Sequence, residues 1–143
     1  MRKLLIIPIV VVSSASSAGD AVMLEAGAYE VQMRLELPHV ETMNVQKTAQ
    51  VCIIDGGTRG IVVMSENNPL ARCPASNIKQ TADELVFDLI CEGHNQAVAQ
   101  AKFQLLPDRF SGAFEMKMGG KNMTMTERQT GRRIGTCADR PRS

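Results

Sequence analysis

The sequence predicts an all-β domain. It is expected to be an antiparallel meander of about seven to eight strands, rolled into a small barrel or sandwich and cross-linked by two disulfides. Three observations support this prediction. Apolar and polar residues alternate with period two, turn residues separate the alternating runs, and four cysteines follow an export signal. Strands that each have one apolar face must cover it by closing into a barrel or by packing as a sandwich.

The chain begins with the features of a removable export signal. Two basic residues precede an apolar run over 4–12, and small residues then lead to a cleavage pattern that ends at Ala18. This run is too short to cross a membrane, because a spanning helix needs about 20 residues. We therefore expect residues 1–18 to be removed and residues 19–143 to form one periplasmic or secreted domain with no transmembrane segment.

The first predicted strands lie at residues 27–37 and 44–54. From Tyr29 to Leu37 the odd positions are apolar and most even positions are charged or amide side chains, which is typical of a strand with one buried face. The segment from Asp55 to Pro69 is rich in glycine and ends in proline. Its apolar centre is compatible with either a short strand or a turn of helix.

Five further strands are predicted between Ala71 and Gln129 as an up-and-down meander. Their turns are expected at 81–84, 92–95 and 107–108, and at 119–120, where two glycines supply the positive φ angles of a two-residue hairpin. Apolar residues again occupy alternate positions within the strands, as in Ala97, Ala99, Ala101, Phe103 and Leu105. Such runs indicate half-buried antiparallel strands rather than helices.

The four cysteines can pair in three ways. Export delivers them to an oxidising compartment, so disulfides are expected. Cys73 and Cys91 flank the turn near Ala82 and Asp83 and therefore stand almost opposite each other on adjacent strands. This favours a Cys73–Cys91 bridge, which leaves Cys52–Cys137, and both bridges are expected to be structural.

Several short motifs follow one another along the mature chain. Residues 27–31 read Gly-Ala-Tyr-Glu-Val, 48–52 read Thr-x-Gln-x-Cys, 110–112 read Phe-Ser-Gly, and 131–137 read Gly-Arg-Arg-Ile-Gly-Thr-Cys. Together with the cysteines that bracket a hairpin, this order resembles the secreted bacterial proteins grouped as domain-of-unknown-function family 3617. In that family a lysine is commoner at the position of Arg132. The resemblance covers nearly all of the mature chain and implies a periplasmic β domain with no established activity.

The charge balance excludes some classes of function. The chain has 16 basic and 15 acidic residues, and loss of the two basic residues of the signal leaves a mature charge near −1. A general nucleic-acid or membrane-surface binder needs a basic face, so neither class is expected. Arginines gather only toward the C-terminus, where we interpret them as a solvated, frayed tail: Arg128, Arg132, Arg133, Arg140 and Arg142.

Methionine is the compositional anomaly, with nine in a chain that has no tryptophan and one tyrosine. Met116, Met118, Met123 and Met125 flank the predicted glycine turn and share one face of the sheet. A two-residue hairpin would place Met116 opposite Met123. Soft thioethers select Cu(I), so the cluster could hold this ion. Methionine also fills cores or forms adaptable apolar surfaces, and we favour core packing because no histidine or cysteine joins the cluster.

No catalytic pattern is present. The sequence lacks a C-x-x-C pair, a G-x-S-x-G elbow, an H-E-x-x-H motif, a P-loop and a dinucleotide fingerprint. His39 and His94 are expected in solvated turns. We therefore predict no catalytic residues and no cofactor.

These expectations favour a non-catalytic periplasmic binding or accessory protein with an apolar cavity or a partner-facing surface. Its partner would be a periplasmic protein or a small apolar ligand, and no nucleic acid is expected. Two alternatives are a methionine-based Cu(I) carrier and a small periplasmic enzyme or enzyme inhibitor. An internal cavity would favour ligand binding, whereas a filled core would favour a role of the surface.

Overall fold

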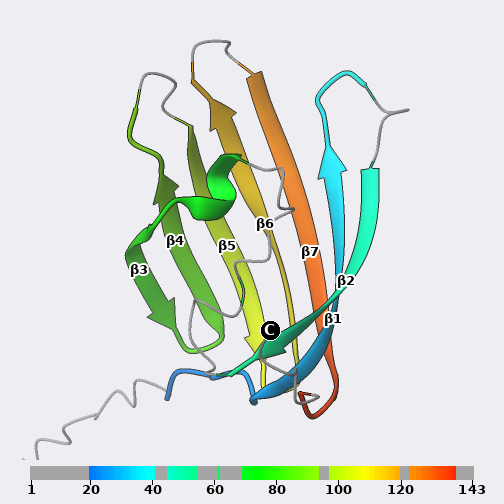
Figure 1. The fold of residues 1–143 in the computed structure, drawn as a ribbon. Coiled ribbons are helices and arrows are strands. Elements are labelled where there is room, and N and C mark those ends of the chain that lie inside the picture. Colours follow the sequence, from blue (N-terminus) through cyan, green and yellow to red (C-terminus); the bar gives the residue numbers. More distant parts are fainter. Residues whose placement is uncertain are drawn as a thin grey trace, which may run out of the picture.

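The computed structural model describes residues 20–40, 45–54, 61, 69–93, 97–119 and 123–137, so the predicted signal lies outside the described residues. Seven antiparallel strands form one sheet (Figure 1). The strands are β1 (Gly27–Glu36), β2 (Val45–Ile53), β3 (Ala75–Thr81), β4 (Glu84–Ile90), β5 (Val98–Leu106), β6 (Arg109–Met118) and β7 (Met123–Gly135). A short 3₁₀ helix, η3 (Pro69–Arg72), precedes β3.

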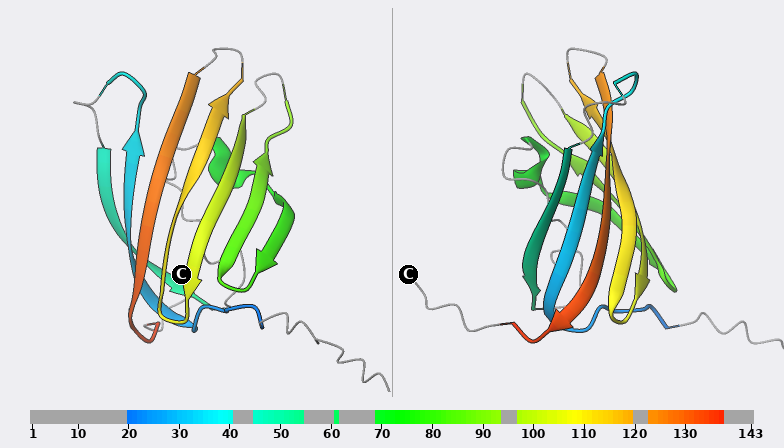
Figure 2. Two further views of the ribbon diagram at one scale, coloured as in Figure 1. Left: turned by 180° about the vertical axis from the view of Figure 1, so that it is seen from behind. Right: turned by 90° about the vertical axis from the view of Figure 1, so that its right-hand side faces the viewer.

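The strands are ordered β2-β1-β7-β6-β5-β4-β3 across the sheet. The five-strand meander predicted for the C-terminal half runs from β3 to β7, and β1 pairs with β7 to attach the N-terminal hairpin. The sheet is strongly curved but does not close, since β2 and β3 are its two edges (Figure 2). The predicted all-β meander is therefore confirmed, and its form is a single open sheet rather than a closed barrel or a sandwich.

The inner face of the sheet carries the hydrophobic core. Aromatic rings from alternate strand positions pack there with centroids 5.2 to 6.3 Å apart: Tyr29, Phe87, Phe103, Phe110 and Phe114. Ile61 and Leu70, from the connection between β2 and β3, are fully buried in the same core. In Figure 1, η3 lies over the inner face of the sheet. Because it covers apolar side chains that a closed barrel would cover with its own strands, the sheet can stay open.

The segment before β1 lies across one end of the sheet. The backbone N–H of Val22 donates to the carbonyl of Ala82 at 2.8 Å, and that of Glu25 donates to the carbonyl of Pro107 at 2.7 Å. The hydroxyl of Tyr29 also donates to the carbonyl of Glu25, at 2.7 Å, and burial raises the pKa of this hydroxyl. These bonds hold the β3–β4 and β5–β6 turns against the N-terminal segment.

The two predicted disulfides are confirmed. Cys73–Cys91 joins the two ends of the β3–β4 hairpin, with Cα atoms 5.2 Å apart. Cys52–Cys137 joins edge strand β2 to the second residue after the end of β7, with Cα atoms 5.5 Å apart. In the chain-entropy model, closing loops of these lengths stabilises the fold by about 3 and about 4–5 kcal/mol respectively.

The interpretation of the C-terminal arginines as a frayed tail is wrong for three of them. Strand β7 continues past the predicted end at Gln129 to Gly135 and pairs with β1 on one side and β6 on the other. Arg128, Arg132 and Arg133 therefore belong to a central strand, where neighbours on both sides keep the backbone paired. Residues 138–143, with the remaining two arginines, lie outside the described residues.

Candidate functional site

The four candidate methionines have different surroundings. Met116 is 1% exposed in the core and Met125 packs partly buried against it, whereas Met123 is 43% exposed. The side chain of Met118 lies outside the described part of the chain. Met116 faces Met125, and Met118 faces Met123, so four residues rather than two connect β6 to β7. Burial of the Met116–Met125 pair supports core packing.

A buried polar pair on the inner face of β7 was not predicted. Glu127 is 4% exposed and Gln129 is 1% exposed, and Nε2 of Gln129 donates to Oε1 of Glu127 at 2.7 Å. The signal in the sequence is that the inward positions of β7 change from apolar to polar along the strand: Met123, Met125, Glu127, Gln129 and Gly131. The pair therefore lies inside the domain, on the same face of the sheet as the aromatic core.

Polar side chains on the outer face form rows that cross four strands. Facing residues of neighbouring strands share a row, so the register determines which residues stand together. The row next to the β5–β6 turn, here called the arginine row, contains Glu30, Arg132, Arg109 and Leu106. The next row, here called the hydroxyl row, contains Gln32, Thr130, Ser111 and Gln104.

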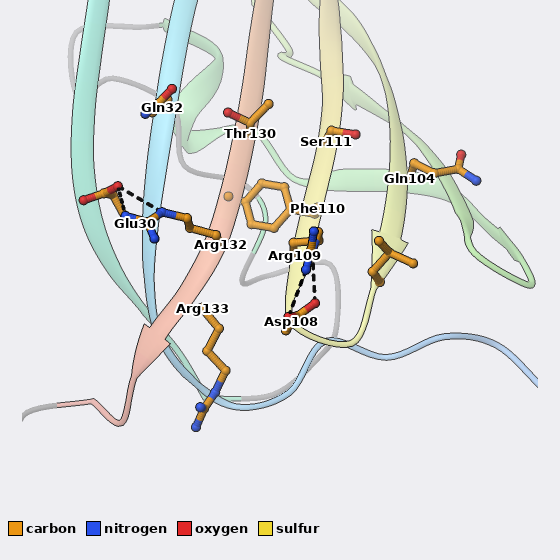
Figure 3. Close-up of a pocket in the computed structure, with 12 residues that line it drawn as sticks. Glu30, Gln32, Gln104, Asp108, Arg109, Phe110, Ser111, Thr130, Arg132 and Arg133 are labelled. Carbon is orange, nitrogen blue, oxygen red and sulfur yellow. Dashed lines mark hydrogen bonds and ion pairs between the residues drawn. The ribbon is translucent and has the colours of Figure 1, made fainter.

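The arginine and hydroxyl rows line a depression of about 610 Å³ on the outer face (Figure 3). In the hydroxyl row the small side chains of Ser111 and Thr130 stand between two longer glutamines. A second depression of about 460 Å³ begins at the same two residues and extends toward Ala113 and Arg128. The outer face of β6 and β7 is therefore hollowed where its side chains are small, and polar donors surround the hollow.

Two like charges face each other in the arginine row. Arg109 of β6 is the register partner of Arg132 of β7. Facing residues have Cβ atoms about 4.5–5.5 Å apart, and like charges at this separation destabilise a sheet. Each arginine pairs with a carboxylate of its own: Arg132 with Glu30 of β1, and Arg109 with Asp108, the residue before it. The two are consequently held in place as separate ion pairs.

The hydrogen bonds orient both guanidinium groups. Nε and Nη2 of Arg109 donate to the two carboxylate oxygens of Asp108 at 3.1 and 3.3 Å. Nε and Nη2 of Arg132 donate to Oε1 of Glu30 at 3.3 and 3.0 Å. Figure 3 shows each guanidinium turned toward its carboxylate. A guanidinium has five N–H groups, so each arginine keeps donors that these carboxylates do not use.

The ion pairs fix the charge state of the site. The hydrogen bond from Arg109 lowers the pKa of Asp108 below its usual 3.8, and the same bond raises the pKa of Arg109. Both groups therefore remain charged near neutral pH. Three arginines and two carboxylates line the depression, since Arg133 also contributes while its Nε donates to the carbonyl of Ala26 at 3.0 Å. The lining has an excess of one positive charge.

Stability alone does not account for this arrangement. The side chains of Arg109 and Arg132 are 62% and 70% exposed. Ion pairs at such exposure contribute about 0–1 kcal/mol to folding. Repulsion between facing like charges reduces even this amount. The arrangement is better suited to presenting hydrogen-bond donors to an incoming partner than to holding the sheet together.

The described residues contain neither a metal-binding cluster nor a membrane-spanning helix. Within them, no group of three or more His, Cys, Asp or Glu side chains could hold a metal ion. No helix in the same residues is long and apolar enough to cross a membrane. His39 lies in an exposed turn after β1, and His94 is outside the described residues.

Comparison with protein families identifies the group to which the chain is related. The model of the family described as "Protein of unknown function (DUF3617)" matches residues 24–137. This span includes all seven strands and the four cysteines, so the chain belongs to this family, as the order of its motifs predicted. No curated protein and no solved structure matches the chain.

Proposed function

We propose that this member of the DUF3617 family is an exported, non-catalytic binding protein that engages its partner through the outer face of its sheet. One observation carries the proposal: four strands join the arginine and hydroxyl rows into a depression lined by oriented polar donors. The inner face, by contrast, is occupied by the aromatic core and by the β2–β3 connection. This favours a role of the surface over an apolar cavity.

Export is supported by two independent features. The N-terminal sequence has the pattern of a removable signal. All four cysteines form disulfides, which persist in oxidising compartments and are rare in the cytosol. The periplasm, or the exterior of the cell, therefore suits the protein.

A binding role is supported by the charge states of the depression. General acid–base catalysis is most effective when the pKa of the catalytic group lies near the operating pH. The pKa of Asp108 is lowered and that of Arg109 is raised, so both move away from neutral pH. Permanently charged and hydrogen-bonding groups recognise a ligand without transferring protons to it.

The polar groups of the lining favour a polar partner. Guanidinium, hydroxyl and amide groups stand over apolar carbon surface in the depression, where Leu106 and Phe110 are the large apolar side chains. Desolvating these polar groups against an apolar ligand would leave their hydrogen bonds unmade, which is unfavourable. We therefore favour a polar partner over the small apolar ligand expected from the sequence.

Nuclear magnetic resonance can test the location of binding. Isotope-labelled protein is mixed with concentrated periplasmic extract from its native host, and the backbone amide signals are followed. We expect the signals of Ser111, Thr130 and Gln104 to shift. The double variant Ser111→Leu/Thr130→Leu fills the depression with apolar side chains and should lose these shifts.

A matched control is the variant Gln46→Leu/Thr48→Leu. It makes changes of the same kind on the outer face of edge strand β2, at two residues that do not line the depression, and should respond as the wild type does. Circular dichroism checks that all variants are folded. Absence of shifts in the wild type, or shifts confined to core residues such as Ala99 and Met116, would contradict a surface-mediated role.

A further inference from the structure

The geometry points to a phosphoryl group as the part of the partner that occupies the depression, bound between Arg109 and Arg132 and by the hydroxyls of Ser111 and Thr130. This inference rests on the proposed function, because it names the chemistry of the ligand at the same site.

The register places four donor side chains at the corners of one small quadrilateral. Arg109 faces Arg132, and Ser111 faces Thr130, in adjacent rows of the β6–β7 ladder. Residues two apart in a strand project from the same face and lie about 7 Å apart, whereas facing residues lie about 5 Å apart. Long arginine side chains and short hydroxyls at these spacings can contact one tetrahedral anion together.

The number of donors matches a phosphoryl group better than a carboxylate. A carboxylate offers two oxygen atoms, while a phosphoryl group offers three strong acceptor oxygens and carries a charge of about −1.5 to −2. The planar fork of arginine suits paired phosphate oxygens, and each hydroxyl adds one donor. Gln32 and Gln104 extend the same row with amide donors. Two guanidinium groups and two hydroxyls would leave a carboxylate with more donors than it can accept at once.

An anion between the arginines would also relieve their mutual repulsion. Glu30 lies beyond Arg132 on β1, whereas Asp108 directly precedes Arg109 and its backbone carbonyl accepts from the N–H of Arg133. The facing arginines bring two positive charges together on adjacent strands. Because ion pairs already restrict both guanidinium groups, an anion that recruits them immobilises side chains with reduced freedom, which lowers the entropic cost of binding.

The wider surface favours one anionic group over a polyanion. Several other cations of the outer face are paired with acidic residues: Lys102 with Glu84, and Arg34 and Arg128 with Glu36. Nucleic acids and strongly anionic membranes need an extended basic face. On the described strands the cations of the outer face are interspersed with acidic residues, and its second facing arginine pair, Arg34 and Arg128, shares Glu36.

Calorimetric titration with inorganic phosphate tests the inference, with ionic strength held constant because salt screens exposed charges. We expect saturable binding by the wild type that is tighter than binding of acetate. Arg109→Gln and Arg132→Gln should each weaken phosphate binding about tenfold or more, since each removes charged hydrogen bonds. Arg132→Lys keeps the positive charge but loses the planar, forked guanidinium. Its affinity for phosphate should lie between that of Arg132→Gln and that of the wild type.

The matched control is Arg34→Gln. Arg34 is an exposed, ion-paired arginine on the same face that does not line the depression. This variant should bind phosphate within about twofold of the wild type, as expected for an exposed charge outside the site. Equal losses in Arg34→Gln and Arg109→Gln would show nonspecific charge attraction and overturn the inference.

Vesicles distinguish free phosphate from a lipid headgroup as the source of the phosphoryl group. The protein could bind phosphatidylglycerol vesicles through Arg109 and Arg132 and yet not bind inorganic phosphate. This result would identify a lipid headgroup as the source of the phosphoryl group and would support the inference. Failure of both probes, or phosphate binding no tighter than that of acetate, would overturn the inference. If the periplasmic extract still shifted the amide signals of Ser111 and Thr130 in that case, the proposed binding function would stand, but with a ligand of a different chemical class.

Discussion

Arg109 in β6 lies directly opposite Arg132 in β7, and each donates two hydrogen bonds to a carboxylate of its own, that of Asp108 and that of Glu30 respectively. Facing like charges are unusual because they destabilise a sheet. Natural sequences depart from such local rules mainly at functional sites. The two carboxylates orient the guanidinium groups, and each guanidinium keeps N–H donors that its carboxylate does not use.

The Asp108–Arg109 pair predicts an abnormal acid titration. The carboxyl of Asp108 should titrate below its usual pKa of 3.8, and its pKa should rise toward that value in Arg109→Gln, because the hydrogen bond from Arg109 is the main cause of the shift. A lowered pKa stabilises the fold above the unfolded-state pKa, and this contribution is lost as pH falls through the folded-state pKa. Carbon-13 resonance of the side chain measures both values. Identical titrations in the two proteins would contradict the assigned cause.

Gly131 is predicted to be essential for close packing between β7 and β6. A Cβ atom at this position would overlap the ring of Phe110 on the facing strand. Gly131→Ala should therefore lower the free energy of unfolding by about 1–3 kcal/mol through overpacking. Urea denaturation measures this loss. Ser111→Ala, on the outer face of β6, should change the free energy of unfolding by less than about 0.5 kcal/mol. Similar values for the two variants would contradict the packing explanation.

The buried methionine should behave as a core residue. Met116→Leu conserves volume and should cost less than about 1.5 kcal/mol of unfolding free energy, whereas Met116→Ala should cost about 2–5 kcal/mol. Met123→Ala, at an exposed position, should cost less than about 0.5 kcal/mol. Chemical denaturation provides these values.

Copper titration separates packing from metal binding at the same residues. If the cluster serves as core, Met116→Leu/Met125→Leu should bind Cu(I) no more weakly than the wild type. A marked loss of Cu(I) affinity in a folded Leu variant would instead support the carrier function, because the ligand sulfur atoms are gone.

Much of the strand pattern could be predicted from local sequence. Period-two alternation identified the inward residues of β1, β5 and β6, because a strand with one buried face must repeat every two residues. The cysteines around the β3–β4 turn indicated their pairing, because a hairpin brings its ends together. These features depend only on residues close together in the chain.

The arginine row could not be predicted in the same way. It arises from the register of strands that are far apart in sequence, with Glu30 in β1 brought beside Arg132 in β7. Each arginine alone is an ordinary surface charge, and together they suggested a frayed tail. The open form of the sheet likewise depends on where the β2–β3 connection packs, which alternation does not encode.

The two disulfides should differ in their contribution to stability. The Cys52–Cys137 bridge spans 85 residues and the Cys73–Cys91 bridge spans 18. Because loop-closure entropy grows with length, replacing the longer bridge by serines should cost about 4–5 kcal/mol and the shorter about 3 kcal/mol. Equilibrium unfolding of the two paired-serine variants compares them. A larger loss for the shorter bridge would contradict a purely entropic origin.

The most direct test of the binding account follows the arginine side chains themselves. Inorganic phosphate is titrated into nitrogen-15-labelled protein at constant ionic strength, and the Nε–Hε signals of Arg109, Arg132 and Arg34 are recorded. The account predicts that the signals of Arg109 and Arg132 shift together with one dissociation constant, while that of Arg34 stays in place. Unchanged signals, or equal shifts of all three, would contradict it.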